Sequence, residues 1–153
     1  MHRPALGEED LGARAWFGER ATAAGLELQV DGAGNHFACL ACGPEGAPSL
    51  LLGSHLDSVP QGGRFDGQLG VLAAYEVLRS VREAGISLPV HLEAIDFTDE
   101  EGTLVGLLGS RALAGSLPED ELANPRGGRK RLVEGLTRAG IDEARIQDAR
   151  RDP

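Results

Sequence analysis

The spacing of hydrophobic positions changes from a helical period to a two-residue period near the start of the chain. Residues 8–24 place Leu11, Ala15 and Trp16 on one side, with charged residues between them, which predicts a helix. Residues 26–42 then alternate apolar and polar positions on both sides of the turn sequence DGAGN. This alternation predicts a β-hairpin.

A strand, a helix and a second strand follow the hairpin. The sequence SLLLGS at 49–54 is a short apolar run, typical of a central strand covered on both faces. Residues 68–84 carry apolar positions at helical spacing, and Gly85 closes this predicted helix. Residues 88–98 read as the next strand. This order predicts parallel strands joined by a right-handed crossover. The predicted fold is therefore α/β, a β-hairpin joined to a parallel βαβ core.

Polar side chains gather where the two parallel strands end. The first strand runs into GSHLDSVPQGGRFDG at 53–67, and the second runs into TDEEG at 98–102. Sites in such sheets form beyond the carboxyl ends of the strands, so these residues should meet. They are His55, Asp57, Asp66, Asp99, Glu100 and Glu101. A cation would relieve the repulsion among the carboxylates, and one imidazole with carboxylates suits zinc, manganese or cobalt better than calcium.

The charge of the chain favours a small-molecule ligand. The 153 residues have the length of one domain and a net charge of −9. Residues 1–110 hold 6 basic and 16 acidic side chains, whereas residues 111–153 hold 9 and 8, so the acidity accompanies the candidate site. This balance argues against nucleic acid and anionic membranes as partners. Since no apolar stretch has the length of a membrane helix or signal core, a cytoplasmic protein is predicted.

The two cysteines predict no metal or redox site. Cys39 and Cys42 occur in the sequence CLAC, which resembles half of a zinc knuckle or a redox motif. A zinc site would need a second pair of Cys or His residues at suitable spacing, and none follows. The pair lies in an alternating stretch, so we interpret both as small buried residues of a strand.

Three sequence segments, taken in order, resemble one family. They are GSHLDSVPQGGRFDGQLGVLAAYEVL from position 53, AIDFTDEEG from position 94 and GSRALAG at 109–115. Together they resemble the hydantoinase/carbamoylase-type amidases, which include N-carbamoyl-L-amino-acid hydrolase and allantoate amidohydrolase, within the dinuclear-metal aminopeptidase-like hydrolases. The resemblance runs from about residue 13 to at least Gly115. The segments GGRFDG and TDEEG point to this amidase branch rather than to the related peptidases and acylases.

The resemblance implies a role for each matching residue. His55 would bind one metal ion, Asp66 would bridge two, and Glu101 would bind the second. Glu100 would be the general base, and Asp57 would hold the other ring nitrogen of His55. The implied cofactors are two divalent ions, zinc first, with manganese, cobalt or nickel as alternatives. The resemblance also implies a cis peptide bond after Asp66.

Three further residues are expected outside the metal site. His91 lies at the opposite end of its strand from the TDEEG segment, at a distance of roughly 20 Å or more from the metals, so we reject it as a ligand. Asp99 is expected to be structural. Arg111 is expected to support the site from beneath rather than to contact a substrate carboxylate.

The chain matches only part of what the family uses. Members supply two further histidine ligands downstream and a lid domain that serves dimerisation and substrate binding, and neither is found here. We therefore interpret residues 1–153 as the N-terminal portion of a catalytic domain, with a core at 8–116 and a helical, partly basic tail at 117–153. The implied substrate is a small ureide or an N-carbamoyl amino acid, and the motifs do not choose between them. Full-length relatives are expected to be homodimers.

Three functions therefore stay open. The first is a hydrolase of linear amide or ureido C–N bonds, inactive as this short chain unless a complementing C-terminal chain completes it. The second is a non-catalytic fragment or half-protein that binds a partner. The third is a related metallo-exopeptidase or aminoacylase.

Overall fold

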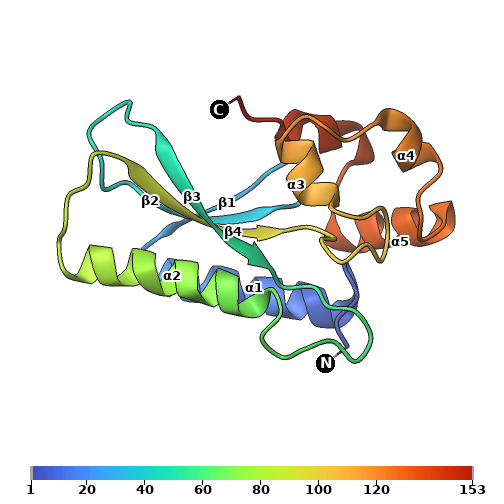
Figure 1. Ribbon diagram of the computed structural model, residues 1–153, viewed down its shortest axis with the longest axis horizontal. Helices are drawn as coiled ribbons and strands as arrows, with labels where there is room; N and C mark the ends of the chain where they lie inside the picture. The colour runs from blue at the N-terminus through green and yellow to red at the C-terminus, as the bar shows by residue number, and fades with distance from the viewer. Residues whose placement is uncertain (1, 153) are drawn as a thin grey trace.

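The computed structural model describes residues 2–152, which form a four-stranded sheet and two groups of helices (Figure 1). The elements in chain order are α1 (Glu8–Ala23), β1 (Glu27–Val30), β2 (His36–Leu40), β3 (Ser49–His55), α2 (Gln68–Glu83), β4 (His91–Phe97), α3 (Leu108–Leu113), α4 (Glu119–Ala123), α5 (Arg129–Ala139) and the 3-10 helix η1 (Glu143–Ala149). Helices α1 and α2 run along one face of the sheet, while the later helices gather at one end of it (Figure 1). The predicted α/β class is confirmed.

The sheet joins the hairpin to the βαβ unit. Its strand order is β1-β2-β4-β3. Strand β1 pairs antiparallel with β2, and β2 pairs antiparallel with β4. Strands β3 and β4 are parallel, with His55 paired to Phe97 at their carboxyl ends. The predicted hairpin and parallel pair are therefore confirmed, and the two parallel strands end side by side.

The prediction that residues 49–54 form a central strand covered on both faces is wrong for the part of the chain that the structure describes. Strand β3 lies at the edge of the sheet. Leu50 is 50% exposed, and Leu51 and Leu52 are only partly buried. The reason is the pairing order. Strand β4 lies between β3 and the hairpin, and no other described strand pairs with β3.

Two clusters of buried apolar residues hold the chain together. One lies between the sheet and helices α1 and α2, and includes Phe17, Ala38, Val71, Leu78 and Leu92. The other includes Leu6, Leu104, Leu108, Leu132 and Ile146. This second cluster joins the N-terminal segment and α3 to the predicted helical tail, which forms α4, α5 and η1. Within residues 2–152, no helix has the length and apolar character needed to cross a bilayer.

Helix α1 buries charge instead of its tryptophan. Trp16 is 43% exposed, and the guanidinium of Arg20 lies 5.7 Å from its ring centroid. On the buried side, Arg14 is 3% exposed, and both Asp10 and Asp96 of β4 are 0% exposed. These three residues, here called the Arg14 cluster, form ion pairs in which Nε of Arg14 lies 3.2 Å and 3.3 Å from the two carboxylates.

The Arg14 cluster should make the stability of the chain depend on pH. Burial raises the pKa of Asp10 to about 6, against the opposing effect of Arg14, from an ordinary value of 3.8. Between these values the folded chain holds a proton that the unfolded chain has released. The free energy of unfolding contributed by Asp10 should therefore fall as the pH rises from about 4 to about 6. The free energy of unfolding of the wild type minus that of Asp10→Asn, both measured in urea, should fall as the pH rises across this range. If the two free energies change with pH in parallel, the raised pKa of Asp10 is wrong.

Candidate metal centre

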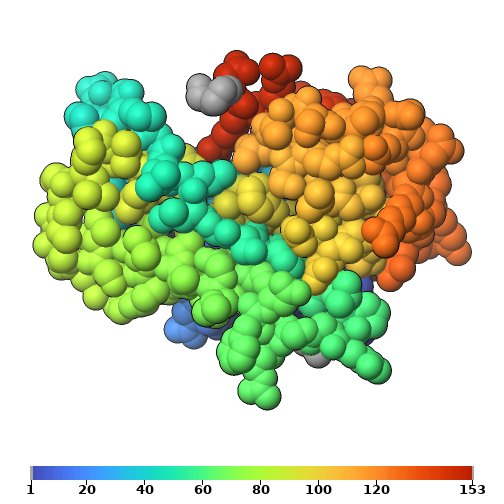
Figure 2. Space-filling view, in the orientation of Figure 1, coloured from blue at the N-terminus to red at the C-terminus, as the bar shows by residue number. Residues whose placement is uncertain are grey.

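The candidate centre is built where β3 and β4 end side by side. His55 is the last residue of β3 and is 5% exposed. The acidic segment TDEEG follows β4 directly, so Glu100 and Glu101 reach the same edge of the sheet. Asp66 comes from the loop at 56–67, which stands out from the body of the molecule beside α2 (Figure 2). Three separate segments thus deliver side chains to one place.

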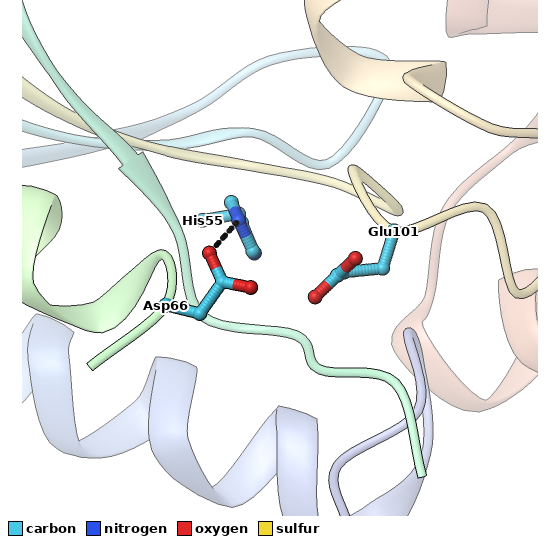
Figure 3. Close-up of side chains that lie close together, drawn as sticks. All are labelled: His55, Asp66 and Glu101. Carbon is cyan, nitrogen blue, oxygen red and sulfur yellow. Dashed lines mark ion pairs between the residues drawn. The ribbon is translucent and has the colours of Figure 1, made fainter. Parts of the chain in front are cut away.

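The three predicted metal ligands converge. One ligand atom from each of His55, Asp66 and Glu101 lies within 4.8 Å of the other two, and the side chains face a common space (Figure 3). Nε2 of His55 lies 4.0 Å from Oδ1 of Asp66 and 3.3 Å from Oε2 of Glu100. The side chain of Asp66 is 63% exposed and that of Glu100 is 35% exposed, so the group opens to solvent on one side.

Asp57 connects the histidine to the acidic turn. Nδ1 of His55 lies 3.1 Å from the backbone oxygen of Asp57 and 3.4 Å from its Oδ1. The two carboxylate oxygens of Asp57 also accept hydrogen bonds from the backbone N–H groups of Glu100 and Glu101, at 3.3 Å and 3.2 Å. Asp57 is fully buried. Its one carboxylate therefore fixes the relative positions of the imidazole and both glutamates.

The electrostatics of the site follow from this crowding. Burial of His55 disfavours its charged form, but the contact with Asp57 and the charge of Glu100 outweigh burial and raise the pKa of the imidazole to about 9. Burial raises the pKa of Glu100, against the lowering effect of His55 and together with the neighbouring carboxylates. The carboxylates around His55 thus carry more negative charge than its single imidazolium can balance.

Gly67 allows the loop to pass close to His55. Its φ is +75°, a conformation that side chains disfavour. A Cβ atom there would lie 2.4 Å from the backbone oxygen of His55 and 2.5 Å from two atoms of its ring. No described peptide bond is cis, so the expectation of a cis bond after Asp66 is wrong.

Replacing Gly67 by alanine should therefore displace the imidazole and strain the loop. We expect Gly67→Ala to lower the free energy of unfolding by about 1–3 kcal/mol and to weaken cation binding. Urea unfolding and titration with Co²⁺ measure the two effects. Gly63→Ala is a matched control, since a Cβ there meets only Cβ of Asp66, at 3.7 Å. Equal behaviour of the two variants would contradict the close approach described here.

Asp99 and Arg111 have structural contacts. The fully buried carboxylate of Asp99 accepts hydrogen bonds from the backbone N–H groups of Leu104, Val105 and Gly106, and so holds the turn after β4. Arg111 forms a bidentate pair with Glu121, with both N–O distances 2.7 Å. Among the contacts described for residues 2–152, neither side chain touches His55, Asp66 or Glu101.

His91 and the two cysteines lie away from the site. His91 begins β4, at the end opposite the acidic turn, and its Nδ1 accepts a hydrogen bond from Gly43. Cys39 and Cys42 are free and only partly buried. Burial raises the pKa of the Cys39 thiol to about 11, which keeps it protonated at neutral pH. Cys39 lies in β2, as interpreted, but it is only partly buried, and Cys42 lies beyond the end of that strand at Leu40.

Sequence reasoning missed the Arg14 cluster. Asp96 lies within the apolar strand β4, and Asp10 and Arg14 are four residues apart on one face of α1. These two patterns were the available signals, because a charged residue on a buried face needs a partner. The contact between Arg14 and Asp96 joins segments far apart in the sequence, so it could not be read from local spacing.

The residues present fit a divalent cation. One imidazole and two carboxylates are ligands that zinc and similar ions accept. Oε1 of Glu101 is buried and has no hydrogen-bond partner. A buried carboxylate oxygen is rarely left unsatisfied, and a cation would satisfy it. By contrast, the groove of about 780 Å³ between α1 and the hairpin is lined by none of the three converging ligands.

The fold and the site together define an α/β domain with a candidate cation centre at the ends of its parallel strands. The family described as Peptidase family M20/M25/M40 matches residues 51–146, and the chain belongs to this family. It is 42% identical over 132 residues to an N-carbamoyl-L-amino acid amidohydrolase of Geobacillus stearothermophilus, a match covering 85% of this chain and 32% of that protein. It is 38% identical over 116 residues to allantoate deiminase 1 of Glycine max, covering 72% and 21%.

A solved structure gives the same result. The chain matches a hydantoinase/carbamoylase family amidase from Burkholderia ambifaria with a TM-score of 0.82 and 38% identity, covering 92% of this chain and 35% of that one. The resemblance predicted from the motifs is thereby confirmed. The chain spans about a third of the length of these relatives or less.

Proposed function

We propose that the chain supplies catalytic carboxylates and part of the cation centre of a metal-dependent amidohydrolase acting on linear, non-peptide C–N bonds. The observation that carries the proposal is the convergence of His55, Asp66 and Glu101, with Glu100 at 3.3 Å from the imidazole. The names of the relatives, an N-carbamoyl-L-amino acid amidohydrolase and an allantoate deiminase, support the reaction class. The proposed substrates are N-carbamoyl-L-amino acids or small ureides.

In this proposal two divalent cations occupy the centre. His55 would hold one, Glu101 would hold the other and Asp66 would serve both, with zinc as the first candidate and manganese, cobalt or nickel as alternatives. When bound, such ions polarise the scissile carbonyl and lower the pKa of water towards neutrality. An amide or ureido carbonyl needs this help, because it is a poor electrophile.

Glu100 is the proposed general base. Its partly exposed carboxylate lies beside His55 and is open to solvent, where a substrate would enter. There it would accept a proton from the attacking water and donate it to the leaving nitrogen. The raised pKa of Glu100 suits this role, because the carboxylate must both accept and release a proton. Asp57 would hold the imidazole of His55 through Nδ1 and so set which ring nitrogen faces the cation.

The 153-residue chain alone should bind cations weakly and turn over no substrate. All four histidines lie at or before position 91, and only His55 belongs to the cluster. One imidazole and two carboxylates provide too few ligands for two ions. Further ligands would come from polypeptide outside residues 1–153. The homodimer expected for full-length relatives stays a prediction. Assays with N-carbamoyl amino acids and allantoate, with added zinc, manganese or cobalt, measure this. Robust turnover by the chain alone would contradict it.

A chimera tests the proposed function directly. Residues of this chain would replace the matched segment of the Geobacillus stearothermophilus relative, and hydrolysis of N-carbamoyl-L-amino acids would be measured. We expect a folded, cation-loaded chimera with turnover. A chimera that folds and binds cations but does not turn over substrate would reject a catalytic role and favour a partner-binding fragment. Hydrolysis of dipeptides or N-acyl amino acids instead would favour the related exopeptidases and aminoacylases.

A further inference from the structure

The Arg14 cluster touches the end of β3 next to the proposed ligand. Oδ1 of Asp96 accepts a hydrogen bond of 2.7 Å from the backbone N–H of Leu56, the residue that follows His55. A charged acceptor makes such a bond strong. Asp96 lies in the neighbouring strand β4, so this contact ties the carboxyl end of β3 to β4 beyond the last ladder pair, His55 with Phe97.

Arg14 touches the end of β4. Its Nη1 donates to Oγ1 of Thr98 at 3.1 Å and to the backbone oxygen of Gly34 at 2.7 Å, and its Nη2 donates to the backbone oxygen of Phe97 at 3.3 Å. Thr98 opens the TDEEG segment that carries Glu100 and Glu101. The planar guanidinium therefore holds the start of the acidic turn, while its Nε lies against Asp96.

Stability alone is a weak reason for this arrangement. The cluster buries two carboxylates and one guanidinium. Removing such charges from water costs so much that apolar side chains of similar size often serve stability as well or better. The specific feature is where the contacts lead. Besides contacts with Leu6 and Gly34, they reach the backbone directly after His55, and the backbone directly before the turn with the two glutamates.

We propose that Arg14 and Asp96 are positioning residues for the cation centre. They set the spacing between the imidazole of His55 and the carboxylates of the acidic turn, without touching a cation or a substrate themselves. This inference rests on the proposed function and adds to it two residues outside the ligand set.

The test replaces Arg14 by lysine in the full chain. Lysine keeps the positive charge beside Asp10 and Asp96, but its single ammonium cannot hold Phe97 and Thr98 as a planar fork does. We expect the Kd for Co²⁺, measured by the visible absorption of the bound ion, to rise about tenfold or more, as for other groups that orient ligands. Leu78→Ala is the control, because Leu78 is fully buried in α2 and its loss lowers stability without touching the Arg14 cluster.

Two results would overturn the inference. One is a Kd for Arg14→Lys within twofold of the wild type. The other is an equal loss of Co²⁺ affinity in Leu78→Ala, since general loosening would then be the cause. If Arg14→Lys does not fold, Asp96→Asn takes its place with the same readouts, because it keeps an acceptor for Leu56 and removes the charge that faces Arg14.

A second readout separates this inference from the proposed function. If the wild-type chain shows no measurable Co²⁺ binding, the chimera decides whether the cation centre exists, and amide hydrogen exchange in the metal-free chain decides the positioning role. We then expect the amides of Leu56, Glu100 and Glu101 to exchange at least about tenfold faster in Arg14→Lys than in Leu78→Ala, because a held backbone amide exchanges slowly. Equal rates in the two variants would overturn the positioning role.

Discussion

Glu100→Gln should reduce the turnover of the chimera by about 10²–10⁴-fold, the usual contribution of a general acid–base group. Glutamine has the size of glutamate and can stay 3.3 Å from Nε2 of His55, but it cannot take up a proton. Glu100 is not one of the three converging ligands, so the cation content should be unchanged. The measurements are kcat with N-carbamoyl-L-amino acids and the metal content of the purified protein.

Glu119→Gln is the matched control for Glu100→Gln. It makes the same chemical change at an exposed position at the start of α4 and should leave kcat unchanged. If Glu100→Gln keeps the turnover of the parent chimera, another group carries the proton. If it loses turnover together with its cations, Glu100 acts as a ligand rather than as the base.

The strand ends could be predicted because their signals are local. The apolar run of β3, the helical period of α2 and the apolar positions of β4 each follow from side-chain spacing. Parallel strands must end at the same edge of a sheet. The sequence therefore placed His55 beside Glu100 and Glu101 without any knowledge of the fold beyond one βαβ unit.

The parts that could not be predicted depend on pairing between distant segments. An apolar run such as SLLL indicates a strand, but it does not say whether another strand lies beyond it, and β3 lies at the edge. The buried face of α1 carries Asp10 and Arg14 because Asp96 of β4 lies opposite. A helical period read by hydrophobicity alone favours Trp16 instead, which is exposed.

Asp57→Asn should weaken cation binding by about 10–100-fold, the usual effect of losing a group that orients a ligand. The Asp57 carboxylate accepts from two backbone N–H groups, those of Glu100 and Glu101, and lies 3.4 Å from Nδ1 of His55. Asparagine has one acceptor oxygen, and its amide group would face an N–H donor. One backbone amide of the turn would lose its partner, and the imidazole would lose its negative neighbour. Titration with Co²⁺ measures the change.

The contribution of the Asp57 carboxylate can be separated from that of turn capping in general. Asp142→Asn makes the same change in the turn that opens η1, where Asp142 accepts a hydrogen bond from the backbone N–H of Ala144. Its Co²⁺ affinity should match the wild type, because that turn carries none of the three converging ligands. If Asp57→Asn also binds as the wild type does, the backbone oxygen of Asp57, 3.1 Å from Nδ1, is sufficient to orient His55. If both variants lose affinity equally, the cause is loosening of the fold, and Asp57 has no special part in the centre.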